Sequence, residues 1–197
     1  DVLLNDIFKI IIIPVYVMVV SNLVNMHSGY NGLQSGLSFI LICAVSIESW
    51  QDGKLDKIVP TAAFLGSLFC FWLFNRFPSK VFEGNIGSLL YGSLLGCIIV
   101  VQEYWWFGFF ILIPHTFNFI LWIIWLYLMK KRPEKYLMED GQHRKFGYTN
   151  DGDIIQVPNR LTLKWIPNYY YKLNEPTSVN VLYLITASFS ILGIIIF

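Results

Sequence analysis

Residues 7–36 read IFKIIIIPVYVMVVSNLVNMHSGYNGLQSG, an apolar run that ends in a cluster of polar and small residues. The apolar part, residues 7–23, has the composition of a membrane-spanning helix. The polar part, residues 22–36, contains three asparagines, one histidine, two serines and three glycines, and a second apolar run follows it. Such a cluster between two spans is either a turn or a binding site, and the rest of the chain decides between the two.

The chain as a whole is strongly apolar. Of its 197 residues, 55 % are hydrophobic and 14 % are charged, and the mean hydropathy is +0.55. A soluble core of this size could not bury so much apolar surface. Six apolar segments emerge, and several are shorter than the ~20 residues of a perpendicular span, so that neighbouring helices or a thinner bilayer must cover their ends. We therefore predict an all-α fold, a polytopic transmembrane helix bundle with spans at residues 7–23, 37–50, 58–75, 86–102, 105–129 and 179–197.

Two further patterns concern helix shape and packing. Pro14 and Pro114 lie within predicted spans, where each removes a backbone hydrogen bond, and we expect a kink at each. Ser88, Gly92 and Gly96 recur every four residues and give one helix a small face for close packing. We interpret that face as architecture and not as part of a site.

The basic residues are distributed unevenly between the two sides of the predicted bundle. The loops at residues 24–36, 76–85 and 130–178 share one side, which holds 11 of the 14 lysines and arginines. By the positive-inside rule this side is cytoplasmic, and the short acidic turns around Asp52 and Glu103 are external. We therefore expect an integral, multi-pass membrane protein whose polar loops converge at the cytoplasmic surface.

The third loop, residues 130–178, is long enough to fold on its own side of the membrane. Its start, KKRPEKY at residues 130–136, is typical of positive-inside signalling or of attraction to a lipid surface. Residues 147–158 contain Asn150-Asp151-Gly152 and predict a hairpin turn between two short strands. The loop is thus expected to form a small cytoplasmic cap before the last span.

The first polar loop carries residues suited to a site. Gly29 and Gly32 let the backbone approach a ligand closely or adopt positive φ, and Asn25 and Asn31 offer uncharged donors and acceptors. The stretch NLVNMHSGYNGLQSG resembles the Asn-x-x-Asn-(five residues)-Asn-Gly-Leu-(two residues)-Gly signature of the polyprenyl-phosphate N-acetylhexosamine-1-phosphate transferases, glycosyltransferase family 4. The asparagine at position 31 and the lack of a His-rich triplet make it most similar to the eukaryotic and archaeal branch.

The resemblance continues along nearly the whole chain. Residues 76–85, RFPSKVFEGN, are similar to the family's second cytoplasmic motif, which usually ends in Phe-x-Gly-Asp. An aromatic-Asn pair follows in the next long helix at Phe117-Asn118, and NRLTL at residues 159–163 precedes the last span as in eukaryotic members. The family fold has about ten spans and an earlier Asp-Asp motif. Residues 1–197 therefore resemble the C-terminal part of the membrane transferase domain, and we expect this part alone to be inactive.

The resemblance implies transfer of N-acetylglucosamine-1-phosphate, or a related sugar-1-phosphate, from a UDP-sugar to polyprenyl or dolichyl phosphate with release of UMP. This is an early step of lipid-linked glycan synthesis, for N-glycosylation or for a cell-envelope glycan. The resemblance also implies a divalent cation, Mg2+ or alternatively Mn2+. The expected partners are the UDP-sugar, the lipid phosphate, membrane lipid and a second copy of the chain in a homodimer, and no nucleic acid is expected. The membrane would be the plasma membrane in a prokaryote and the endoplasmic reticulum in a eukaryote.

The resemblance also implies roles for single residues. Asn25 and Asn85 would be catalytic metal ligands, although Asn85 stands where the family usually has an aspartate and so brings one negative charge fewer. The nucleotide would be bound by Gly29, Asn31, Gly32 and Phe82, with Asn31 facing the uracil, Gly29 giving a backbone contact and Phe82 stacking on the base. The pyrophosphate and sugar would contact His143 and Arg144.

Three points stay open at this level. His27 lies in the first polar loop and could contact a phosphate, whereas His115 lies in a long helix and is expected to pack there through hydrogen bonds. A transporter is disfavoured because the candidate ionisable residues Lys9, Glu48 and Glu103 lie near span ends. A non-catalytic relative that acts as a partner or scaffold is the alternative to the transferase, because of Asn85 and the missing Asp-Asp motif.

Overall fold

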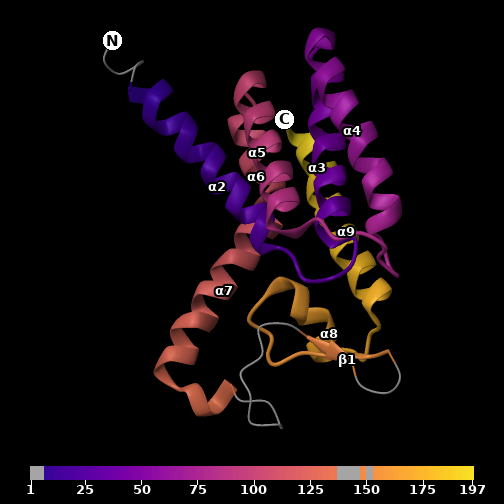
Figure 1. Cartoon of the computed structure of the whole chain (residues 1–197). Helices are drawn as coiled ribbons and strands as arrows, with labels where there is room; N and C mark the ends of the chain where they lie inside the picture. The colour runs from indigo at the N-terminus through magenta and orange to yellow at the C-terminus, as the bar shows by residue number, and fades with distance from the viewer. Residues whose placement is uncertain (1–6, 137–146, 150–152) are drawn as a thin grey trace.

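The computed structural model describes residues 7–136, 147–149 and 153–197 (Figure 1). Most of the chain is helical. The long helices are α2 (Ile13–Met26, preceded by the π-helical segment η1, Phe8–Ile12), α3 (Leu33–Gln51), α4 (Leu55–Asn75), α5 (Gly84–Gln102), α7 (Ile113–Lys131, preceded by the short α6, Trp105–Ile111) and α9 (Glu175–Ile196). Between α7 and α9 lie η2 (Pro133–Tyr136), β1 (Tyr148–Thr149), β2 (Ile155–Gln156), η3 (Leu163–Trp165) and α8 (Ile166–Tyr170).

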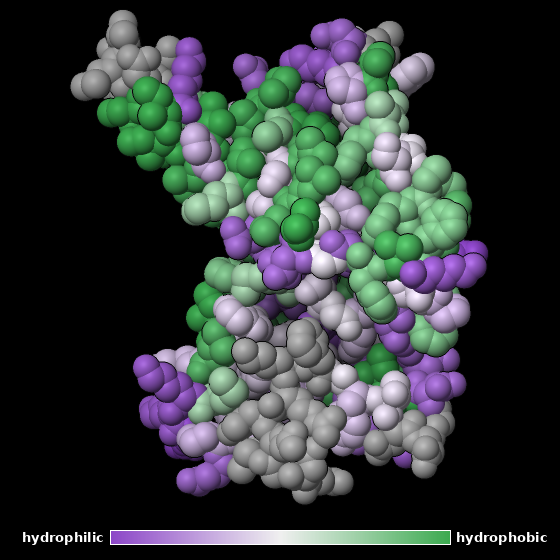
Figure 2. Space-filling model, in the orientation of Figure 1, coloured by the Kyte–Doolittle hydropathy of each residue, from purple (hydrophilic) through white to green (hydrophobic). Residues whose placement is uncertain are grey.

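The helices have the lengths and composition of membrane spans. Five of them are long and apolar enough to cross a bilayer, and α6 with α7 makes a sixth if that bent pair counts as one span. Large apolar side chains such as Ile10, Ile86 and Trp106 are exposed on their outer surfaces. In Figure 2 the upper half of the molecule is mostly hydrophobic, between hydrophilic residues at its upper end and a hydrophilic band across the middle. The predicted polytopic helix bundle is thus confirmed.

Helix α3 lies at the centre of the bundle, where it packs against α4, α5 and α9. Leu37, Leu41 and Ile42 are fully buried, and so are the hydroxyl-bearing residues Ser38 and Ser49. The serines lower the hydropathy of this segment without facing lipid, because neighbouring helices cover them. The span predicted at residues 37–50 therefore begins four residues earlier, at Leu33, and is the most buried of all.

Helices α2 and α5 approach each other closely through small residues. A Cβ atom at Gly92 would lie 2.6 Å from the Cα of Ser21, and one at Gly96 would lie 3.2 Å from the Cα of Val17. The Ser93 hydroxyl donates a hydrogen bond of 3.1 Å to the Ser21 hydroxyl across the same interface. The predicted small face is confirmed, and it brings the end of α2 beside the beginning of α5.

The kink expected at Pro114 is confirmed. Helices α6 and α7 meet at an angle of 58°, with the break at Leu112 and the proline in the first turn of α7. Proline fits this first turn because the N–H it lacks has no intrahelical partner there. Pro14 instead follows η1 directly, and the two segments form one span, Phe8–Met26, so the kink expected at Pro14 is not marked by a break like that at Pro114. Figure 1 shows α7 running out of the bundle beside the segments that follow it.

A small folded segment follows α7 and lies below the bundle in Figure 1. Strands β1 and β2 pair antiparallel, with Tyr148 opposite Gln156, so the predicted hairpin strands are confirmed; the turn residues 150–152 lie outside the described part of the chain. Trp165 is 1 % exposed and packs edge-to-face on Trp125 of α7, with ring centroids 5.2 Å apart. This apolar contact fixes the segment against the membrane helices.

Candidate active site

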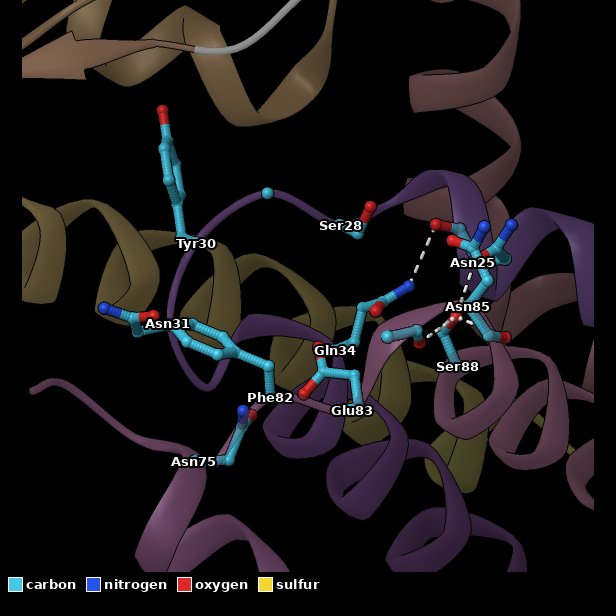
Figure 3. A pocket seen from close by; sticks show the side chains of 12 residues that line it. Asn25, Ser28, Tyr30, Asn31, Gln34, Asn75, Phe82, Glu83, Asn85 and Ser88 are labelled. Carbon is cyan, nitrogen blue, oxygen red and sulfur yellow. Dashed lines mark hydrogen bonds between the residues drawn. The ribbon is translucent and has the colours of Figure 1, made fainter. Parts of the chain in front are cut away.

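A cavity of about 390 Å³ opens where the first two polar loops meet (Figure 3). Both loops contribute, together with the helix ends that flank them. The residues that line the cavity are Asn25, Ser28, Gly29, Tyr30, Asn31, Gln34, Asn75, Phe82, Glu83, Gly84, Asn85 and Ser88. The predicted convergence of these two loops on one side of the bundle is therefore confirmed. Five of the predicted site residues, Asn25, Gly29, Asn31, Phe82 and Asn85, lie around this one cavity.

Two helices begin at the cavity. Gln34 belongs to the first turn of α3, and Asn85 and Ser88 belong to the first two turns of α5. The first turn of a helix has N–H groups without intrahelical partners and carries a partial positive charge, which favours anions. A cavity bordered by two such ends is suited to a negatively charged group.

Gly32 does not line this cavity, although the sequence pattern made it a candidate contact. It is buried and adopts a φ of +76° directly before α3. A Cβ atom at this position would lie 2.9 Å from the Cα of Arg76 in the second loop. Glycine is thus required both by the backbone conformation and by the close approach of the two loops. Gly32 supports the site by letting the first loop pack against the second, without lining the cavity.

Hydrogen bonds fix the end of α2. The Asn25 side-chain oxygen accepts a hydrogen bond of 2.5 Å from the Ser88 hydroxyl. The Gln34 side-chain amide donates to the backbone oxygens of Val24 and Asn25, at 2.8 and 2.9 Å. Gln34 falls at an unspecified position of the sequence pattern and Ser88 was interpreted only as a packing residue, so the sequence alone gave neither of them a role in the site.

The second loop is held by Asn75 at the end of α4. Its side-chain oxygen accepts a hydrogen bond of 2.7 Å from Ser35, and its side-chain nitrogen donates one of 2.8 Å to the backbone oxygen of Val81. The next residue, Phe82, is 76 % exposed at the cavity, so that its ring is available to a ligand. The sequence did not point to Asn75 as a site residue either, because a single asparagine at the end of a span belongs to no recognisable motif.

Glu83 is the carboxylate among the described residues that line the cavity. Burial raises the pKa of its carboxyl group above the ordinary value, because desolvation outweighs the hydrogen bonds from its own backbone and from Asn75. Its Oε2 atom is buried and has no hydrogen-bond partner in the described part of the protein. No sequence pattern pointed to Glu83 as a site residue.

The third loop contacts the first one through hydrogen bonds. The backbone N–H of Asn31 donates a hydrogen bond of 2.5 Å to Oε1 of Glu175, in the first turn of α9. The Tyr30 hydroxyl lies 3.1 Å from the side-chain oxygen of Asn168 in α8. Burial, and secondarily the Glu175 charge, raises the pKa of Tyr30. All three polar loops therefore meet at one end of the bundle, as predicted.

Lys164 of η3 provides a positive charge directly behind the cavity wall. Its ammonium group donates a hydrogen bond to the backbone oxygen of Ser28, and a Cβ atom on Gly29 would lie 2.8 Å from its Nζ. Burial lowers the pKa of Lys164 to about 8. Ser28 and Lys164 also border a second cavity of about 170 Å³ beside Trp122 and Trp165. In the sequence Lys164 was merely one of many basic residues.

The two histidines face each other away from the cavity. His27 and His115 are 0 % and 1 % exposed, and their rings meet edge-to-face at 4.7 Å. Full burial leaves no room for the phosphate contact that the sequence left open for His27, and burial lowers the pKa of this residue, helped by the charges of His115 and Lys164. His115 is a buried packing residue as predicted, but the hydrogen bonds expected for it are not found, because neither of its nitrogens has a partner in the described part of the chain. His143 and Arg144 lie outside the described residues.

Comparison with known proteins agrees with this geometry. The profile of glycosyl transferase family 4 matches residues 1–103, which include both loops of the cavity. A protein of Methanocaldococcus jannaschii named "Putative glycosyltransferase" is 30 % identical over 97 % of this chain and 60 % of its own length.

Two further relatives match over shorter stretches. One, from Sulfolobus acidocaldarius, is named "Putative UDP-N-acetylglucosamine--dolichyl-phosphate N-acetylglucosaminephosphotransferase" and is 32 % identical over 58 % of this chain and 35 % of its own length. The phospho-N-acetylmuramoyl-pentapeptide-transferase of Enterococcus hirae is 37 % identical over 44 % of this chain and 27 % of its own length. The chain thus spans at most about three fifths of these relatives. It belongs to glycosyl transferase family 4.

Proposed function

We propose that this chain forms the nucleotide-binding part of a membrane enzyme that transfers a sugar-1-phosphate from a UDP-sugar to a polyprenyl phosphate and releases UMP. The observation that carries the proposal is the single cavity at which Asn25, Asn31 and Asn85 meet between two helix N-termini. The name of the Sulfolobus relative supports N-acetylglucosamine as the sugar and dolichyl phosphate as the acceptor, whereas the Enterococcus relative carries a different sugar in its name.

The donor diphosphate would lie between the beginnings of α3 and α5. Their backbone N–H groups and partial positive charges stabilise a phosphate group, and Lys164 adds a full positive charge from behind the Ser28–Gly29 backbone. Gly29 would let the loop backbone contact the nucleotide. Charge that develops on the phosphoryl oxygens would thus meet the N–H groups of two helix ends that the fold already holds in place.

The uracil base would lie against Phe82, whose ring is exposed at the cavity. An aromatic face accepts a base by stacking without discriminating among bases. The Asn31 side chain would provide that discrimination, because an amide can pair with both a carbonyl oxygen and an N–H group of the uracil. The backbone of Asn31 is held by Glu175, which orients this side chain.

A divalent cation, Mg2+ or Mn2+, fits the donor atoms of the cavity. Both ions prefer oxygen ligands, and the side-chain oxygens of Asn25 and Asn85 line the cavity together with a buried carboxylate oxygen that has no partner in the described structure. When bound, the cation would neutralise the diphosphate and polarise the phosphoryl group. Ser88 would orient Asn25 for this role through its hydrogen bond.

The lipid phosphate would reach the cavity from the adjoining bilayer. The cavity lies at the end of helices with exposed apolar faces, so a phosphate on a membrane-embedded chain can approach without leaving the surface. The excess of basic residues on this side supports a cytoplasmic location of the cavity. We retain the homodimer and the plasma membrane or endoplasmic reticulum as expectations.

The test is UMP release from UDP-N-acetylglucosamine and a polyprenyl phosphate by the full gene product that contains this chain, with and without Mg2+. We expect Mg2+-dependent release that Asn25→Ala abolishes. A panel with UDP-N-acetylgalactosamine and UDP-N-acetylmuramoyl-pentapeptide would identify the sugar. Absence of UMP release with every donor, by protein that is folded and still inserted in the membrane, would favour the non-catalytic partner or scaffold.

A further inference from the structure

Glu83 is positioned by the helix that it precedes. It is the residue directly before α5, where a negative charge is stabilised by the helix N-terminus. One turn later stands Gly87, at which a Cβ atom would lie 2.7 Å from the Cβ of Glu83. Any other residue at position 87 would push the Glu83 side chain aside. The close fit therefore holds the carboxylate at the cavity.

The side chains around this carboxylate are already engaged with other partners. Figure 3 shows the Glu83 carboxylate pointing into the cavity, near the side chains of Gln34 and Asn75. The Gln34 amide nitrogen donates to the backbone oxygens of Val24 and Asn25. The Asn75 amide nitrogen donates to the backbone oxygen of Val81. A hydrogen bond from Asn75 favours the charged form of the Glu83 carboxyl group, but its Oε2 atom has no hydrogen-bond partner in the described part of the protein.

A buried, charged carboxylate oxygen without a partner is unfavourable, and either a proton or a bound cation relieves the cost. Among the described residues that line the cavity there is no lysine or arginine. Lys164 contacts the far side of the Ser28–Gly29 backbone instead. The cavity thus combines amide oxygens, one carboxylate and no basic side chain of its own, which is the chemistry of a site for a small, oxygen-seeking cation.

We propose that Glu83 is the anionic ligand that holds the divalent cation in this cavity, together with the neutral oxygens of Asn25 and Asn85. The inference rests on the proposed function, since that reaction is what requires the cation. Protein sites for Mg2+ commonly use one or two carboxylates along with several water molecules. Without Glu83 the described residues of the cavity would offer the ion only uncharged oxygens, whose attraction for it is weaker.

The test measures Mn2+ binding directly, by the loss of the free-ion signal in electron paramagnetic resonance. The full chain in nanodiscs is titrated with Mn2+, first alone and then with UDP. Glu83→Gln should weaken binding about 10- to 100-fold, the range found when groups that support a metal site are removed. The matched control is Glu103→Gln, the same change at the opposite end of α5 from the cavity, which should bind Mn2+ as the native chain does.

A second variant moves the charge instead of removing it. Glu83→Gln combined with Asn85→Asp returns one carboxylate to the cavity, two residues away, and should recover most of the affinity. Glu83→Asp keeps the charge and should lose only a few-fold, and it serves as the informative variant if Glu83→Gln does not fold, as judged by its thermal unfolding.

The possible results separate this inference from the function on which it rests. Mn2+ binding that is equal in Glu83→Gln and the native chain would overturn the role of Glu83 and leave metal-dependent transfer standing. If neither the native chain nor any variant binds Mn2+, the double variant Glu83→Gln/Asn85→Asp with UDP included, the metal site would be overturned and the proposed transferase with it.

Discussion

The side-chain oxygen of Asn25, at the end of α2, lies 2.5 Å from the hydroxyl oxygen of Ser88, in the second turn of α5. The two residues are 63 positions apart in the chain, and the hydrogen bond joins the first polar loop to the second. It depends on the close packing of α2 and α5 at Gly92, one turn further along α5. The small face that permits helix packing therefore also orients a side chain of the candidate site.

Removing this hydrogen bond should weaken ligand binding with little loss of stability. In Ser88→Ala the Asn25 side chain loses the partner that orients it, which is worth about 0.5–1.5 kcal/mol. We expect UDP affinity in the presence of Mg2+, measured by isothermal titration calorimetry, to fall by roughly 3- to 10-fold. Ser93→Ala is the control, because Ser93 binds Ser21 in the same interface but does not line the cavity. Equal losses in both variants would contradict a specific role for Ser88.

The interface itself makes a second prediction, about stability. In Gly92→Ala the new methyl group would lie 2.6 Å from the Cα of Ser21, so that α2 and α5 must move apart. We expect this overpacking to cost about 1–3 kcal/mol of unfolding free energy in detergent micelles, followed by circular dichroism. Gly66→Ala in α4 is the matched control, since a Cβ atom there meets nothing within 4 Å and alanine favours a helix. A loss of stability in the control that equals the loss in Gly92→Ala would show that the effect is not specific to the interface.

The buried Lys164 predicts a dependence of stability on pH. Its pKa is lowered to about 8 in the folded state, so between pH 8 and 10 the unfolded chain binds more protons than the folded chain. Stability should therefore rise with pH in this window, by about 2 kcal/mol, as the ammonium group loses its charge. Above pH 10 the buried hydroxyl of Tyr30, whose pKa is raised, opposes this trend.

The measurement compares urea unfolding of the native chain and of Lys164→Met from pH 7 to 10. The difference between the two free energies of unfolding should change across this window, because the variant has no group that titrates there. UDP affinity should fall over the same range in the native chain only, if the positive charge contributes to binding. A constant difference in stability would show that Lys164 does not titrate near pH 8.

The sequence was sufficient for the fold class and for one half of the site. The apolar runs and the asymmetric charges predicted the helix bundle and the convergence of its polar loops, and the family resemblance implied that Asn25, Asn31 and Asn85 belong to one site. The central helix of the bundle, α3, was harder to recognise from hydropathy. Helix α3 carries Ser38, Ser49 and other buried polar residues, which lower its hydropathy although no lipid contacts them.

The remaining site residues become visible only in three dimensions. Lys164 reaches Ser28 across 136 positions, and its role depends on how η3 packs against α7 through Trp165. Asn75 holds the second loop through its hydrogen bond to Val81, and Glu83 stands out because its Oε2 atom has no partner in the described structure. Neither feature can be recognised from the spacing of residues in the sequence. His27 shows the converse case, because a polar residue inside a site motif is here a buried packing residue.

The last prediction concerns the base. Phe82 is 76 % exposed at the cavity, and if the uracil stacks on it, Phe82→Leu should lose about 1–3 kcal/mol of binding free energy, the usual range for a base on an aromatic ring. We expect UDP affinity to fall by about 5- to 150-fold, and inorganic pyrophosphate, which has no base, to bind as before. Phe77→Leu in the same loop is the control, since Phe77 is also exposed but does not line the cavity. If Phe82→Leu weakened UDP and pyrophosphate equally, the ring would shape the loop and not bind the base. If UDP binding did not change, the base would lie elsewhere.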